Sequence, residues 1–137
     1  MNFVLSDIAD ADAEKAIRDP LVAYNLDRFG KSDKRELIIT IRDDENAVTG
    51  GLVGYTGRGW LYVQLLFVPE TLRGYGTGQT LLAMAEEEAK KRGCIGAYID
   101  TMNPDALRLY ERYGFTRIGS LAPLSGDQSI TWLEKRY

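Results

Sequence analysis

The chain has 137 residues, of which 45% are hydrophobic and 27% are charged, and its formal net charge is −3. This length and composition are typical of one globular domain, and the acidic balance argues against a nucleic-acid partner, which would require clustered basic side chains. Because the chain has no histidine and only one cysteine, Cys94, it excludes Ser-His-Asp and Cys-His triads, zinc sites of the Cys/His kind and a disulfide within the chain.

The sequence shows no signal for export or for membrane insertion. Its first residues carry no basic region and no apolar run long enough for a signal peptide. No stretch reaches the about 20 apolar residues that span a bilayer. We therefore expect a cytoplasmic protein without a membrane partner. Since no linker, repeat or low-complexity tract divides the chain, residues 1–137 are expected to form a single domain.

The first part of the sequence predicts two short helices and then a meander of strands. An acidic start indicates a helix over 10–18, and Pro20 suits the first turn of a second helix that ends at Gly30. Runs rich in β-branched residues, separated by turn signals such as the one at 43–46, indicate antiparallel strands. These strands are expected over 37–41, 47–55 and 60–68.

The second part of the sequence changes to helical spacing and then returns to strands. Apolar residues at helical spacing predict a long helix over 79–92, which Gly93 ends. A strand over 95–101 precedes a helix over 104–113, for which Asn103 is the expected N-cap. The two closing strands are expected over 115–121 and 129–133.

These elements together indicate the fold class. The strands at 60–68 and 95–101 are joined by a helical crossover, so they should lie parallel. The expected fold is therefore α/β (α+β), with a mixed, largely antiparallel central sheet and flanking helices.

A glycine-rich turn, Arg73-Gly74-Tyr75-Gly76-Thr77-Gly78, opens the long helix. Glycines permit positive φ and the close approach of a ligand, and the amides at a helix start offer donors to an anion. Such a turn can hold a pyrophosphate without a lysine. It is not a P-loop, because Gln79 and Thr80 follow it, nor a dinucleotide fingerprint. A simple tight turn is the alternative.

A second motif follows one strand later, and together the two motifs resemble the GNAT superfamily of acetyl-CoA-dependent N-acetyltransferases. In the first motif, Arg/Gln-x-x-Gly-x-Gly/Ala, the matching residues are Arg73, Gly76 and Gly78. In the second, Asn-x-x-Ala-x-x-x-Tyr-x-x-x-Gly-Phe, they are Asn103, Ala106, Tyr110, Gly114 and Phe115. The resemblance is densest over 65–119.

The resemblance implies a fold and a coenzyme. In the family, acetyl-CoA is the cosubstrate, no metal is required, and the parallel strand pair splays apart around the pantetheine while the pyrophosphate sits on the glycine turn. Asn103 would contact the coenzyme as well as cap its helix. The residues implied to bind the coenzyme are Phe67, Val68, Arg73, Gly74, Tyr75, Gly76, Thr77, Gly78 and Asn103.

The resemblance also implies a catalytic residue and a reaction. The family uses a tyrosine at the position of Tyr110 as general acid to the departing CoA thiolate, and a phenol with a pKa of ~10 is protonated at neutral pH. The alternative is that Tyr110 belongs to an apolar helix stripe and is a core residue. Tyr113 has no motif match and is expected in the core. Cys94 is expected to be a small buried hydrophobe, so the acetyl group should pass directly to an amine.

The sequence assigns no general base. The strand face where many relatives place a carboxylate is expected to carry Trp60, Tyr62, Gln64, Leu66 and Val68. Gln64 cannot accept a proton usefully, which leaves Glu70 and Asp100 as candidates that would act through water.

The acceptor is expected to be a small-molecule or peptide amine. Candidate residues for its binding are Tyr24, Asn25, Tyr62, Gln64 and the turn at 123–127. The chain could form a homodimer. Two alternative functions stay open: a non-catalytic acetyl-CoA-binding module, and a transferase of another acyl group or to an alcohol.

Overall fold

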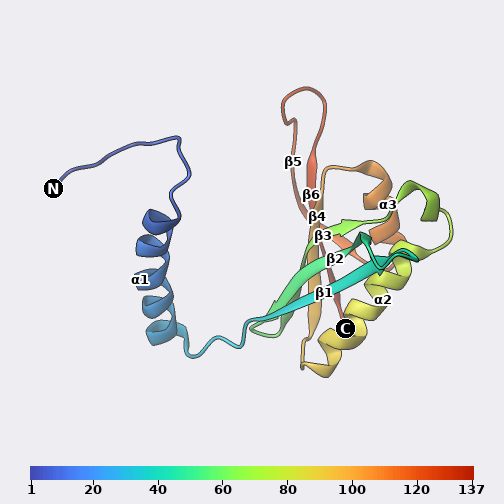
Figure 1. The fold of residues 1–137 in the computed structure, drawn as a ribbon, viewed down its shortest axis with the longest axis horizontal. Helices are drawn as coiled ribbons and strands as arrows, with labels where there is room; N and C mark the ends of the chain where they lie inside the picture. The colour runs from blue at the N-terminus through green and yellow to red at the C-terminus, as the bar shows by residue number, and fades with distance from the viewer. The chain divides into compact units, whose positions relative to one another are not determined.

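The computed structural model describes all residues, Met1–Tyr137, and they form two compact units. The first unit, Met1–Ser32, holds helix α1 (Ala11–Phe29), and the second, Asp33–Tyr137, holds every other element (Figure 1). The expectation of a single domain stays a prediction. No helix is both long and apolar enough to cross a membrane.

Helix α1 is continuous, so the prediction of two helices in this region was wrong. Asp10 caps its start by accepting a hydrogen bond from the Ala13 N–H at 3.0 Å, and Gly30 ends it at a φ of 82°. Pro20 lies inside the helix. Proline holds φ near the helical value and removes one donor, which weakens a helix without forcing it to end. None of the residues of α1 is buried.

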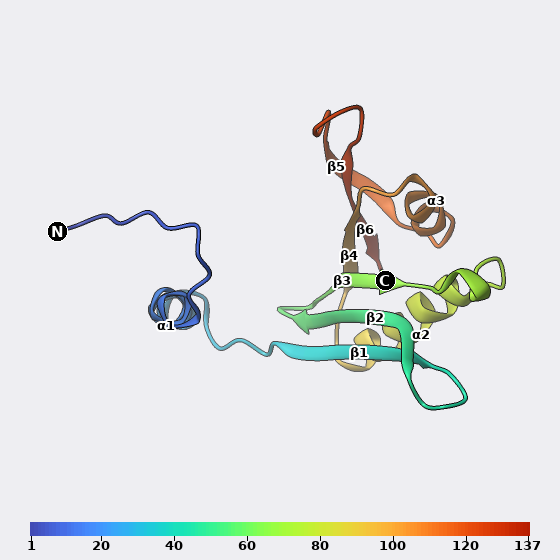
Figure 2. The ribbon, with the colours of Figure 1, turned by 45° about the horizontal axis from the view of Figure 1, so that its top comes forward.

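The second unit contains a six-stranded sheet in the order β1-β2-β3-β4-β6-β5 (Figures 1 and 2). Every neighbouring pair is antiparallel except β3 and β4, which are parallel, as the helical crossover between them predicted. The expected fold class is confirmed. The strands are β1 (Arg35–Arg42), β2 (Val48–Gly57), β3 (Trp60–Phe67), β4 (Gly96–Thr101), β5 (Thr116–Leu121) and β6 (Ile130–Arg136).

Three helical elements accompany this sheet: the 3-10 turn η1 (Glu70–Leu72), α2 (Thr77–Lys91) and α3 (Pro104–Arg112). Helix α2 packs against β1, β2 and β3. The apolar stripe that predicted this helix is buried, and it consists of Leu81, Leu82, Ala85 and Ala89. Opposite it lie the fully buried strand residues Leu52, Leu61, Val63, Ile99 and Leu133. The core therefore lies between α2 and one face of the sheet.

The parallel pair separates after four residues. Strands β3 and β4 are paired from Trp60↔Gly96 to Val63↔Ile99, whereas β4 continues to pair with β6 as far as Thr101. Figure 2 shows β4, β6 and β5 turning away from the layer formed by β1, β2 and β3. The last part of β3 therefore has one edge paired with β2 and one edge free.

A bulge in β3 changes which side chains share a face. Val53 pairs with Leu65 and Gly54 with Val63, so Gln64 is an extra residue on β3. A bulge shifts the alternation of the strand by one position. Leu66 therefore lies opposite Leu52 on the core side, and the prediction that all five alternate residues of this strand share one face was wrong.

Candidate functional site

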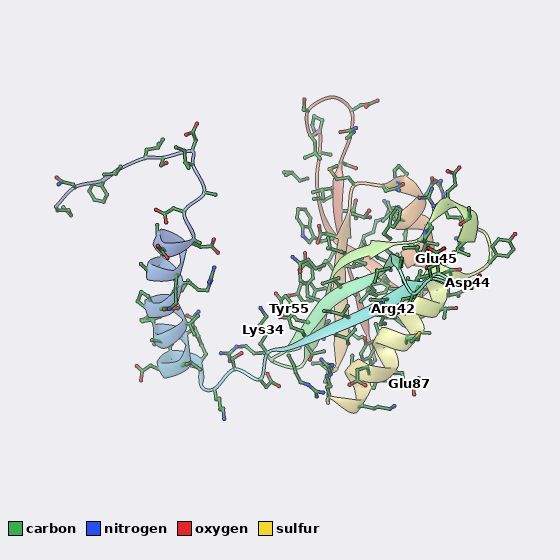
Figure 3. All side chains as sticks on the ribbon, viewed as in Figure 1. Lys34, Arg42, Asp44, Glu45, Tyr55 and Glu87 are labelled. Carbon is green, nitrogen blue, oxygen red and sulfur yellow. The ribbon has the colours of Figure 1, made fainter.

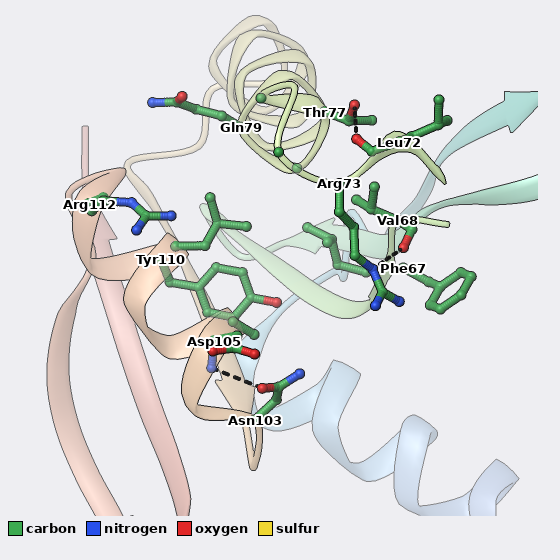
Figure 4. A pocket seen from close by; sticks show the side chains of 16 residues that line it. Phe67, Val68, Leu72, Arg73, Thr77, Gln79, Asn103, Asp105, Tyr110 and Arg112 are labelled. Carbon is green, nitrogen blue, oxygen red and sulfur yellow. Dashed lines mark hydrogen bonds between the residues drawn. The ribbon is translucent and has the colours of Figure 1, made fainter. Parts of the chain in front are cut away.

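A groove of about 520 Å³ runs between the end of β3, the glycine turn and α3. Figure 4 shows the side chains that line it. Eight of the nine residues predicted to bind a coenzyme line this groove, and the exception is Tyr75, which is 81% exposed. The two sequence motifs therefore meet at one site, although they lie on either side of β4 in the chain.

The glycine turn presents main-chain donors at the start of α2. Gly74 and Gly76 have φ values of 84° and 76°, a region in which other residues are strained. The N–H groups of Gly74, Tyr75 and Gly76 donate to no main-chain carbonyl, and the first such bond back into the turn runs from Thr80 to Gly76. Together with the helix dipole, these free donors favour an anion.

Arg73 is fixed at the mouth of the groove by the end of β3. Its Nε donates to the carbonyl of Val68 at 3.0 Å, and its guanidinium lies 5.8 Å from the centre of the Phe67 ring. The Val68 carbonyl is thus engaged by Arg73 rather than free for a ligand. The remaining guanidinium N–H groups stay available as donors beside the glycine turn.

Gly78, the last glycine of the motif, serves packing. A Cβ added there would lie 2.7 Å from Cδ2 of Leu109, so the glycine allows α2 and α3 to approach closely. Thr77 supports the same turn, because its hydroxyl donates to the carbonyl of Leu72 at 3.1 Å. Local hydrogen bonds and close packing hold the turn in place.

Asn103 is the N-cap of α3, as predicted. Its Oδ1 accepts a hydrogen bond from the Asp105 N–H at 2.9 Å, and its own N–H donates to the Thr101 hydroxyl at 3.0 Å. The side-chain oxygen is used for capping, which leaves the amide NH₂ as a donor at the groove. Contact of this amide with a coenzyme stays a prediction.

Tyr110 is both a packed residue and a groove residue. It is 4% exposed and packs against Phe115 with the ring centres 6.1 Å apart. Its hydroxyl nevertheless points into the groove (Figure 4). Burial raises the pKa of Tyr110 to about 12, and the negative charge of Asp100 adds to the shift. This phenol is therefore protonated at neutral pH.

Tyr113 packs in the core and forms a hydrogen bond with a carboxylate there. Its hydroxyl donates to Glu86 at 2.5 Å, and Lys135 donates to the other oxygen of the same carboxylate at 2.8 Å. Burial alone would raise the pKa of Glu86, but these two hydrogen bonds outweigh it and lower that pKa. The side chain packs against the core, as predicted, and does not line the groove.

The residues predicted to bind the acceptor belong to both units of the chain. The Tyr62 hydroxyl donates to Oδ1 of Asp100 at 2.9 Å on the sheet face away from α2, and Gln64 is exposed at the bulge. Tyr24 and Asn25 lie in α1, in the other unit, with Tyr24 61% exposed. A role of these residues in acceptor binding stays a prediction.

Cys94 and Glu70 complete the list of candidate residues. Cys94 is buried at the end of α2 remote from the glycine turn, and burial raises the pKa of its thiol, as expected of a small hydrophobe. Glu70 begins η1 and is exposed. Neither lines the groove.

Sequence reasoning missed one cation of the groove. Arg112 lines it from α3, as Asp105 does (Figure 4), and Leu109 of the same helix also lines it. The signal was present, because these three residues lie at i, i+4 and i+7 and so share one helix face.

The known proteins to which this chain is similar are acetyltransferases. A model of the acetyltransferase (GNAT) family matches residues 4–115. An acetyltransferase from Agrobacterium fabrum is 81% identical over the full length of both chains. A crystal structure from Agrobacterium tumefaciens, assigned as an acetyltransferase, is 81% identical and covers 100% of both chains with a TM-score of 0.99. A Bacillus anthracis protein assigned as a streptothricin acetyltransferase, in complex with acetyl coenzyme A, is 22% identical; it matches 74% of this chain and 62% of its own with a TM-score of 0.65. That last likeness concerns the fold alone.

Proposed function

Because the chain belongs to the GNAT family of acetyltransferases, we propose that it transfers the acetyl group of acetyl-CoA directly to an amine. The observation that carries this proposal is that the free donors of the glycine turn and the hydroxyl of Tyr110 border the same groove. A ligand with an anion at one end and a reactive group at the other would join these two features.

The anionic end of the ligand is the pyrophosphate of CoA in this proposal. The N–H groups of Gly74 and Gly76, at the positive end of the α2 dipole, would receive it. Arg73 and Arg112 supply two further positive charges along the groove. Guanidinium groups bind phosphate oxygens well because their donors match the spacing of those oxygens.

The pantetheine arm would run along the free edge of β3. The strand offers main-chain donors and acceptors there because its pairing with β4 ends at Val63. The coenzyme amides would pair with these groups as an added strand does. This path leads the thioester from the glycine turn toward Tyr110 and Asn103, which line the groove on the side of α3.

The reaction then proceeds by direct attack. The nitrogen of the unprotonated amine forms a bond to the acetyl carbon, the carbon–sulfur bond breaks, and the amine proton passes to water. Tyr110 gives its phenolic proton to the CoA sulfur as the thiolate leaves, and it is restored from solvent. A pKa of about 12 keeps the phenol protonated until that step. The products are the N-acetylated amine and CoA.

The acceptor in this proposal is a small-molecule or peptide amine. A relative supports an amine of the small-molecule kind: a blasticidin-S acetyltransferase from Streptomyces morookaense is 38% identical over 79 residues, which are 57% of this chain and 58% of its own. No metal takes part in the proposed chemistry: the phenol supplies the proton, and the main-chain donors and guanidinium groups supply the positive charge.

Two measurements test this function. A ligand at ~100 times its dissociation constant stabilises a protein by about 2.7 kcal/mol, so acetyl-CoA and CoA should raise the melting temperature while NAD and ATP should not. Thiol release from acetyl-CoA with a panel of amines then tests turnover. No shift with acetyl-CoA would refute the proposal. A shift without turnover on any amine would instead indicate a non-catalytic acetyl-CoA-binding module.

A further inference from the structure

The sheet face turned away from α2 carries four packed aromatic side chains that the transfer chemistry does not use. Tyr62 and Tyr98, register partners on β3 and β4, stack with ring centres 4.8 Å apart. Tyr55 meets Tyr62 edge-on at 5.6 Å, and Trp60 meets Tyr98 edge-on at 6.4 Å. We call these four residues the aromatic cluster. It spans β2, β3 and β4, so it depends on the sheet register rather than on one segment.

Two cations of the chain already lie over rings of the aromatic cluster. The Nζ of Lys34 is 4.5 Å from the centre of the Tyr55 ring, just before β1 begins (Figure 3). The guanidinium of Arg136 is 5.2 Å from the centre of the Trp60 ring. The negative faces of aromatic rings attract cations. This sheet face is therefore suited to positive groups.

Asp100 adds a carboxylate beside the stacked pair. The Tyr62 hydroxyl donates to Oδ1 of Asp100 at 2.9 Å and so holds the carboxylate at the edge of the aromatic cluster. A carboxylate offers about four lone-pair sites, so this bond leaves positions for other donors. A fixed carboxylate next to aromatic faces is the chemistry that recognises an alkylammonium group.

The position of Asp100 also connects this face to the groove. It follows Ile99, the last residue of β4 that pairs with β3, and so lies where the two strands begin to separate. Its negative charge is one cause of the raised pKa of Tyr110, which points into the groove from α3. The carboxylate therefore lies near enough to the Tyr110 hydroxyl for its charge to act on the proposed general acid.

We propose that Asp100 binds one ammonium group of the acceptor while a second amine nitrogen of the same molecule is acetylated, and that the acceptor is a cationic small-molecule amine whose chain packs on the aromatic cluster. This inference rests on the proposed acetyl transfer. Asp100 would touch the substrate, and Tyr62 would be a positioning residue that holds Asp100. The amine nitrogen, once it has lost a proton to water, would reach the acetyl carbon through the opening between β3 and β4.

A binding experiment with two matched probes tests the proposal. Both 1,4-diaminobutane and 4-aminobutyrate carry a primary amine, but the second has a carboxylate in place of the other ammonium. Each is titrated into the protein loaded with CoA, with intrinsic tryptophan fluorescence as the readout. The chain has two tryptophans: Trp60 belongs to the aromatic cluster, and Trp132 is the register partner of Asp100 on β6. We expect the dication to bind at least about tenfold more tightly than the zwitterion.

Variants then test whether the preference for the dication depends on the carboxylate of Asp100. Asp100→Asn should weaken binding of 1,4-diaminobutane by about tenfold or more, whereas Asp100→Glu should retain the preference for the dication. The matched control is Glu87→Gln, which removes an exposed carboxylate from α2, away from this sheet face (Figure 3). It makes the same change in net charge and should leave both affinities unchanged. Melting temperatures of the variants show whether each is folded.

Tyr62→Phe tests the positioning role. It removes the hydrogen bond to Asp100 but keeps the stacked ring, so we expect the ratio of the two affinities to fall, with a loss of melting temperature no larger than that of Tyr113→Phe, which also removes a hydrogen bond to a carboxylate. A merely structural tyrosine would change stability and leave the ratio alone.

The results separate this inference from the proposed function. If CoA fails to stabilise the protein, the proposed function and the inference both fail. If CoA binds but the two probes bind equally, or Asp100→Asn behaves like Glu87→Gln, only the inference is overturned. Equal loss in both carboxylate variants would indicate a general effect of net charge and would overturn it as well.

Discussion

The groove beside α3 and the aromatic cluster on the opposite face of the sheet are built by different means. The groove takes its donors from main-chain groups of a short segment, the turn between η1 and α2, whose glycine conformations are set locally. The aromatic cluster takes side chains from three strands, and only the sheet register brings them together. The main-chain donors of the groove therefore come from consecutive residues, whereas the side chains of the aromatic cluster come from separate strands.

This difference suggests that the groove binds the coenzyme and that the aromatic cluster binds the acceptor amine. Main-chain donors change little when side chains are substituted, so they suit the part of a ligand that stays the same, which for a coenzyme is the pyrophosphate. Side chains at alternate strand positions can be substituted without disturbing the main-chain hydrogen bonds of the sheet. They therefore suit the binding of a ligand that differs between related enzymes, such as the acceptor. Substitutions in the groove should therefore affect acetyl-CoA, and substitutions in the aromatic cluster should affect the amine.

The largest expected effect comes from the phenol of Tyr110, which lines the groove. Tyr110→Phe should lower kcat by roughly a hundredfold or more, because the CoA thiolate would leave without a proton donor. Steady-state rates of thiol release measure this. Tyr113→Phe is the matched control: it should lower the melting temperature by removing the hydrogen bond to Glu86 and leave kcat unchanged. Equal rates for wild type and Tyr110→Phe would assign Tyr110 to the core alone.

The next prediction distinguishes the groove from the aromatic cluster by the ligand whose binding is affected. Arg73→Ala should raise the KM for acetyl-CoA by about tenfold, since a charge-assisted contact to phosphate is lost, and should leave the KM for the amine unchanged. Added salt should weaken acetyl-CoA binding to the wild type more than to this variant. If Arg73→Ala instead raised the KM for the amine, the division between groove and aromatic cluster would be wrong.

The third prediction concerns pH. Burial, followed by the nearby Asp100, raises the pKa of both Tyr62 and Tyr110 to about 12. Because these pKa values lie above the ~10 of an unfolded tyrosine, the neutral phenols stabilise the folded state fully below about pH 10, and this contribution is lost as the pH rises toward 12. Chemical denaturation should show stability falling as the pH rises above about 10, where these phenols begin to ionise in the unfolded chain, with a shallower fall in Tyr110→Phe. The kcat should likewise not decline between pH 7 and 9.5, since ~10 is the lowest pKa that a phenol acid here would have.

The smallest effect is expected at the outer edge of the aromatic cluster. Lys34→Gln removes the ammonium that lies over the Tyr55 ring (Figure 3). It should lower the KM for a cationic amine by about twofold, because one repulsive charge is gone, and by less at high salt. Kinetics with 1,4-diaminobutane at two ionic strengths measure it. A rise in that KM would mean that Lys34 orders the aromatic cluster rather than competing for it.

Local signals predicted most of the helices and strands and brought most of the candidate residues to one groove. Helix periodicity found α2 through its stripe of Leu81 and Ala85, which are buried, and Asn103 before a proline found the cap of α3. The crossover between β3 and β4 gave their parallel pairing. Each of these signals lies within one element or two consecutive elements, so it can be recognised from residues that are near one another in the sequence.

The features that escaped prediction depend on longer-range geometry. The extra residue Gln64 in β3 is invisible without knowledge of its partner on β2, and it moved Leu66 to the other face. The bond between Tyr62 and Asp100 joins residues 38 positions apart. Pro20 was misread because a local breaker signal does not reveal whether the residues on both sides remain helical. The register of the strands and the continuity of helix α1 depend on contacts and neighbours beyond the local sequence signal.

The free edge of β3 has a consequence beyond catalysis. Its unpaired main-chain groups after Val63 are the kind of edge to which a strand of another molecule can attach. A bound pantetheine arm would occupy that edge as a surrogate strand. The coenzyme would then protect the protein from aggregation as well as serve it in chemistry, and the empty form would be the one most prone to self-association in a crowded solution.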